Sequence, residues 1–251
     1  MSMERTESVT CPKCGKVSDF IIWESLNADI DPEAQQQLID GSIFHFTCPE
    51  CGHKSNVNYS MLYHDMTNRV MVHYVQEEAI DATINTIHEV EGKMNDIDKR
   101  LRDGYRTRIV TNQNSLREKA LIFKCGLDDR VVELGKLFLI AHAGQQHPDA
   151  EFTDVFFNES EGNYYFEFIG EQYMQAEFPR SFYDKIVEEL SDYHRHKQAC
   201  PAQTRALDPP QHCPQLRTTD HLYYPRIPDS LLLAEQTGQC HRTLYRSHLH
   251  V

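Results

Sequence analysis

The sequence of 251 residues has no long apolar run and few basic residues. No stretch of about 18 apolar residues is present, so the sequence predicts no membrane-spanning helix and no membrane partner. The first residues lack the apolar segment of a secretory signal, and we therefore expect a cytoplasmic protein. The 25 basic residues face 38 acidic ones, and this formal charge of −13 disfavours nucleic-acid binding through overall charge.

Lysine is missing from residues 198–251, although ten lysines precede them. The earlier residues 1–197 carry 34 acidic and 20 basic side chains, whereas the last stretch is nearly neutral. We divide the sequence into an N-terminal module (1–76), a helical body (77–197) and an irregular tail (198–251). The tail is interpreted as disordered or as an altered reading of the gene.

Two short cysteine motifs lie in the N-terminal module: residues 11–15 read CPKCG and residues 48–52 read CPECG. A Cys-x-x-Cys segment turns so that both sulfurs face one point, and the glycine that follows permits the positive φ that closes the turn. Two such turns supply four thiolates, which is the ligand set of a tetrahedral structural Zn²⁺ site. The sequence therefore predicts one zinc ion held by Cys11, Cys14, Cys48 and Cys51.

Two other roles for these cysteines stay open. A dithiol redox pair would normally use a single motif, whereas this sequence has two. A pair of disulfides is disfavoured because nothing in the sequence indicates export. Because sulfur would fill all four metal positions, we expect a structural ion rather than a catalytic one.

The two motifs occur with WESLN at residues 23–27 and LYHD at residues 62–65, and together they resemble the CpXC domain. This is a bacterial and archaeal family named for its two CPxC motifs. A run over residues 108–131 also resembles the segment that follows in full-length members, so the resemblance covers roughly residues 8–195. It implies no catalytic residues. It implies a metal-binding domain whose ligands are Cys11, Cys14, Cys48 and Cys51.

Strand and helix signals surround the motifs. Asp31 and Pro32 predict the start of a short helix, and Gly41 predicts its end. Alternating and β-branched residues predict the strands of a small antiparallel sheet at 17–26, 43–47, 56–63 and 69–75. Adjacent strand residues face opposite sides, so His64 and Asp65 are interpreted as a polar pair beside a turn and not as a base and its orienter.

The body contains several helix signals and one hairpin signal. Apolar residues spaced three or four apart predict one amphipathic helix from Ile80 to Leu101. We expect it to pack on its own domain, and a coiled-coil dimer is the alternative. Ser115 and Glu118 form a capping box that predicts the next helix. Further elements are predicted as helices at 131–143 and after Pro179, and as a β-hairpin of aromatic strands at 152–157 and 164–169.

The predicted fold is therefore α+β: an N-terminal Cys₄ zinc-ribbon-like module followed by a helical body with a β-hairpin. The favoured function is a zinc-stabilised module that binds another protein. The first alternative is nucleic-acid binding through a basic run of Lys99, Arg100, Arg102, Arg106 and Arg108. A thiol redox or hydrolytic enzyme is the second, although the sequence has no phosphate-binding GxxxxGK[ST] loop and no recognisable catalytic group.

Overall fold

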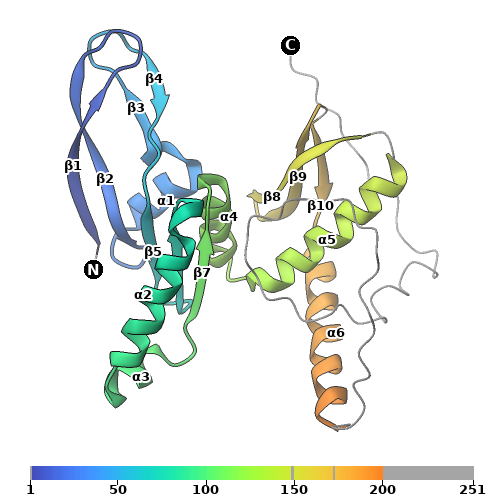
Figure 1. Cartoon of the computed structure of the whole chain (residues 1–251). Coiled ribbons are helices and arrows are strands. Elements are labelled where there is room, and N and C mark those ends of the chain that lie inside the picture. The colour runs from blue at the N-terminus through green and yellow to red at the C-terminus, as the bar shows by residue number, and fades with distance from the viewer. Residues whose placement is uncertain (1, 148–149, 172, 200–251) are drawn as a thin grey trace. The chain divides into compact units, whose positions relative to one another are not determined.

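A computed structural model describes residues 2–147, 150–171 and 173–199, and it is a mixed α+β structure as predicted. The chain packs as two compact units, which divide between Gly126 and Leu127 (Figure 1). The expected boundary after residue 76 falls inside the first unit, because a strand and a helix from beyond it belong to the N-terminal sheet and its cover. The predictions for residues 200–251 lie outside the described residues.

The first unit is built on a five-stranded sheet, whose strands lie in the order β1-β2-β5-β6-β7. Its strands are β1 (Met3–Thr10), β2 (Val17–Asn27), β5 (Met61–Asp65), β6 (Val70–Tyr74) and β7 (Arg106–Val110). The β1–β2 and β5–β6 pairs are antiparallel, as predicted for the whole sheet, whereas β2–β5 and β6–β7 are parallel. A long connection precedes the second strand of each parallel pair, which is the geometry that parallel pairing requires.

Two helices, α1 (Pro32–Asp40) and α4 (Gln113–Lys124), contact each other and cover one face of this sheet. Helix α1 ends as predicted, with Gly41 in the left-handed region at φ 85°. Helix α4 begins two residues before the predicted cap, because the Oδ1 atom of Asn112 accepts a hydrogen bond from the Ser115 amide at 2.8 Å. The buried core between these elements includes Leu26, Leu38, Tyr63, Val70, Val72, Val110, Leu116, Ala120 and Phe123.

The long helix predicted from Ile80 to Leu101 is divided into α2 (Ile80–Lys93) and α3 (Asp96–Arg102), so that prediction was wrong. A short 3₁₀ turn, Glu77–Ala79, precedes α2. The division occurs because Asn95 caps α3: its Oδ1 atom accepts hydrogen bonds from the amides of Ile97 and Asp98 at 2.8 and 2.9 Å. No residue of either helix is fully buried.

A second hairpin, β3 (His45–Thr47) and β4 (Lys54–Asn56), follows the 3₁₀ turn Ser42–Phe44. The strand predicted over residues 56–63 is interrupted between β4 and β5, because β4 pairs with β3 whereas β5 pairs with β2 and β6. The predicted alternation of buried and exposed side chains persists across the interruption.

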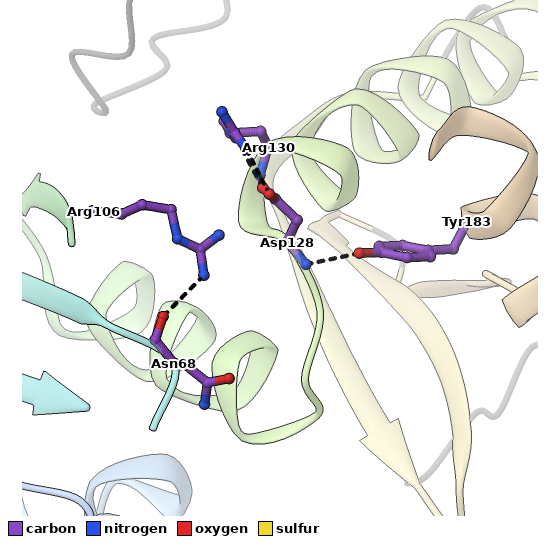
Figure 2. A network of polar contacts seen from close by, with 5 residues as sticks. All are labelled: Asn68, Arg106, Asp128, Arg130 and Tyr183. Atoms are coloured by element: carbon purple, nitrogen blue, oxygen red, sulfur yellow. Dashed lines mark hydrogen bonds and ion pairs between the residues drawn. The ribbon is translucent and has the colours of Figure 1, made fainter. Parts of the chain in front are cut away.

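The second unit contains α5 (Asp129–Gln146), β8 (Phe152–Ser160), β9 (Asn163–Gly170), β10 (Met174–Glu177) and α6 (Arg180–Ala199). The predicted hairpin is β8–β9, and β10 extends it to a three-stranded sheet. Helix α5 is capped by Asp128, whose side chain accepts from the Arg130 amide and whose own amide donates to the Tyr183 hydroxyl at 2.8 Å (Figure 2). The core is aromatic: Phe157, Phe166, Phe168 and Phe178 are all buried. Among the described helices, none has both the length and the apolar character needed to cross a membrane.

Candidate metal centre

The four motif cysteines lie in two turns at one end of the first unit (Figure 1). Cys11 and Cys14 belong to the turn that joins β1 to β2, and Cys48 and Cys51 belong to the turn that joins β3 to β4. The two turns come from different hairpins, so the site links segments that the rest of the sheet does not pair directly.

Each turn is closed by the same two backbone hydrogen bonds. The Gly15 amide donates to the Cys11 carbonyl at 2.9 Å, and the Gly52 amide donates to the Cys48 carbonyl at the same distance. The amides of Cys11 and Cys48 donate in turn to carbonyls five residues later, those of Lys16 and His53. Gly15 and Gly52 have φ values of 73° and 67°, so both turns need the left-handed conformation that the motif's glycine permits.

The four sulfur atoms lie within 4.8 Å of one another. Two of the separations cross between the turns: Cys11 Sγ is 3.7 Å from Cys51 Sγ, and Cys14 Sγ is 3.6 Å from Cys48 Sγ. These separations far exceed a disulfide bond of about 2 Å, and all four cysteines are free thiols. The geometry is compatible with four sulfur ligands around one metal ion.

The cluster is buried on one side only. Cys11 and Cys48 are buried together with Phe46, and Val9, Phe20 and Val57 pack against them. Cys14 is exposed and Cys51 is half-buried. A metal ion here would therefore sit at the rim of a small apolar cluster, with the first cysteine of each motif facing inward.

Hydrogen bonds and neighbouring thiols give Cys11 and Cys14 different pKa values. Burial raises the pKa of Cys11, but the amides of Cys14 and Lys13 and the neighbouring thiols outweigh it and lower this pKa to about 7. The Lys16 amide lowers the pKa of Cys14, but desolvation and the other three thiols raise it to about 12. Without a metal the cluster thus ionises stepwise, and a metal ion must displace protons to bind all four sulfurs.

The basic run is divided between two elements. Lys99, Arg100 and Arg102 lie on α3, whereas Arg106 and Arg108 lie on β7. The Arg102 guanidinium forms an ion pair with Glu91 at 3.3 Å. That of Arg106 lies 5.1 Å from the centre of the Phe123 ring and donates to the Asn68 carbonyl at 3.4 Å (Figure 2). Nucleic-acid binding through this run stays a prediction.

His64 and Asp65 lie on β5 and face opposite sides of the sheet. Asp65 is buried and accepts a hydrogen bond from the Asn68 amide at 2.7 Å. The Nε2 atom of His64 is 3.0 Å from the Tyr105 hydroxyl, and desolvation lowers the histidine's pKa. The two side chains have separate partners and do not form a catalytic pair.

One surface near the cysteines was not identified from the sequence. Val17 and Ile21 on β2 are 55% and 52% exposed, and Trp23 is on the same face of the strand. In the sequence, the signal for this surface was the alternation of Val17 and Ile21 with Phe20 and Ile22, whose side chains face the core. From the sequence alone, these residues predict a strand and nothing more.

Comparison with known proteins identifies a family match. The model of the CpXC protein family matches residues 9–136, a range that includes all four cysteines and four strands of the five-stranded sheet, but only the last two residues of β1. No curated protein and no solved structure matches the sequence.

Proposed function

The chain belongs to the CpXC family, and from that premise we propose that it is a cytoplasmic protein-interaction module stabilised by one structural Zn²⁺ ion. The observation that carries this proposal is the tetrad of sulfur atoms contributed equally by two separate hairpins.

The separations of the sulfur atoms support zinc as the ion. A tetrahedral centre with Zn–S bonds of about 2.3 Å places neighbouring sulfurs about 3.8 Å apart. The two separations that cross between the turns, 3.6 and 3.7 Å, are close to that value, and all four sulfurs lie within 4.8 Å of one another. Four soft thiolates also favour Zn²⁺ over Mg²⁺ or Ca²⁺, which prefer oxygen ligands.

A structural role follows from the ligand set. Zinc enzymes keep one coordination position for water or substrate, whereas four cysteine ligands close the ion to both. The end of the unit that holds the ion has little core of its own, since among residues 45–56 only Phe46 and Cys48 are buried. The ion would therefore hold the β3–β4 hairpin against the β1–β2 hairpin.

The exposed face of β2 beside the metal site supports a role in binding another protein. Val17 and Ile21 are exposed beside the cysteine turn, and they face Thr10 and Thr6 on the neighbouring strand β1. The same face also carries Trp23, an aromatic residue of the kind enriched in protein contact surfaces, and one charged side chain, Asp19, lies between Val17 and Ile21. We assign this face to a protein partner with a complementary apolar patch.

Affinity capture from the native host tests the proposal. The zinc-loaded wild type is compared with Ile21→Asp and with a control, Ile30→Asp, whose isoleucine is 56% exposed on the turn that precedes α1. We expect one partner that is retained by the wild type and by Ile30→Asp but lost from Ile21→Asp, with unchanged zinc content in all three. A partner set that is identical for all three proteins would refute the assignment of this face.

A further inference from the structure

The apolar stripe of α2 and α3 is half-buried at its beginning and at Met94, and is otherwise exposed. Ile84 and Ile87 are half-buried, but Val90, Ile97 and Leu101 are 48%, 68% and 70% exposed. Ile97 and Leu101 lie one turn apart and share a face of α3. These helices lie toward the opposite end of the first unit from the cysteine turns (Figure 1). The exposed part of the stripe is therefore a surface distinct from the metal centre.

The corner between the two helices is well defined. Met94 is extended, with φ −66° and ψ 135°, and the Asn95 side chain accepts hydrogen bonds from two amides of α3. The stripe therefore turns at residues 94 and 95 and continues on the second helix. Any partner of this surface has to fit a bent pair of helices.

The charges along α2 and α3 form a pattern, with acidic side chains before Lys93 and basic ones after Asp98. The segment of residues 77–91 carries five acidic side chains and no lysine or arginine: Glu77, Glu78, Asp81, Glu89 and Glu91. Helix α3 begins with Asp96 and Asp98 and ends with Lys99, Arg100 and Arg102. A partner that fits this surface must present basic groups to Glu89 and Glu91 and acidic groups to Lys93 and to the basic end of α3.

We propose that this partner is a second copy of the chain, bound through α2 and α3 about a two-fold axis at the corner. When that axis is parallel to the bisector of the bent helix pair, each α2 lies antiparallel to the partner's α3, whatever the angle between the helices. Centred between residues 95 and 96, it brings Val90 to Leu101 and Met94 to Ile97. The same register pairs Glu91 with Arg100 and Lys93 with Asp98.

The antiparallel two-fold arrangement is favoured over the parallel one on electrostatic grounds. In the two-fold arrangement each contact occurs twice, and the acidic and basic segments face each other. A parallel pair would instead place Glu91 opposite Glu91 and Arg100 opposite Arg100, which is repulsive. The contact surface is small, so the dimer should be weak and depend on protein concentration.

Sedimentation equilibrium of the full-length, zinc-loaded chain measures this association. We expect the weight-average mass to rise from 29.2 kDa toward twice that value as the concentration increases. Ile97→Asp and Leu101→Asp should remain monomeric, while the control Ile30→Asp, whose isoleucine is 56% exposed elsewhere on the unit, should dimerise like the wild type. Circular dichroism checks that each variant is folded.

Charge reversal tests the register. Asp98→Lys would face Lys93 of the second copy and should weaken dimerisation, and adding Lys93→Glu should restore it. A wild type that stays monomeric at several hundred micromolar would overturn the proposal. So would a dimer that tolerates both Ile97→Asp and Leu101→Asp.

Discussion

Replacing Cys14 by serine should open the second hairpin as well as the first, because the sulfur cluster belongs to both turns. In the segment of residues 45–56, Phe46 is the one large side chain that is fully buried, and its burial contributes about 2 kcal/mol. Fixing the backbone of the same residues costs roughly 1 kcal/mol or more for each residue. Burial therefore falls well short of this cost, and we expect metal–thiolate bonding to supply much of the difference.

Hydrogen–deuterium exchange measures the opening directly. The amides of Cys48 and Gly52 donate within the second turn and should be protected in the metal-loaded wild type. In Cys14→Ser their protection should fall at least about 100-fold, while β5, β6 and α4 keep theirs because the main core does not include the cluster.

Cys125→Ser is the control for loss of a thiol, since Cys125 is half-buried at the end of α4 and lies outside the cluster. It should leave the exchange of residues 45–56 unchanged. If Cys14→Ser keeps the wild-type protection of the second turn, the metal does not hold the two hairpins together, and the reasoning fails.

Three further predictions concern pH, packing and helix capping. Because desolvation lowers the pKa of His64, its contribution to stability is present above about pH 6.5 and is lost as the pH falls through the lowered value. Urea unfolding at pH 7.5 and 5.5 should show a smaller loss for His64→Gln than for the wild type, and equal losses would contradict this. In Gly135→Ala the new methyl group would overlap the buried Phe178 ring, so the free energy of unfolding should fall by about 1–3 kcal/mol, whereas an unchanged melting temperature would refute that packing. Asn95→Ala should cost α3 about 1 kcal/mol and speed amide exchange at Ile97 and Asp98; unchanged exchange would show that the cap is dispensable.

The metal-site residues could be predicted because their signals are local. Both cysteines of a turn lie three residues apart, and Gly15 and Gly52 have the positive φ that the motif requires. The same holds for α1, where Pro32 and Gly41 mark the ends by their own backbone preferences. The structure brings the four predicted cysteines together, although their sequence spacing could not show which hairpins would carry them.

Other features depend on partners that are distant in the sequence. Strand β7 was not predicted, because Arg106 and Arg108 belong to a basic run and its pairing with β6 arises from a long crossover. The parallel pairing of β2 with β5 is likewise set by the connection and not by either strand. The break between α2 and α3 at Asn95 could not be predicted, because the helical spacing of apolar residues continues across it.

The most direct test of the central claim is the metal content of the purified protein, measured by mass spectrometry. The account predicts one zinc ion per chain in the wild type and in Cys125→Ser. It predicts loss of that zinc in Cys14→Ser and in Cys48→Ser, which remove one ligand from each turn. A wild type without zinc whose four motif cysteines are freely alkylated would contradict it.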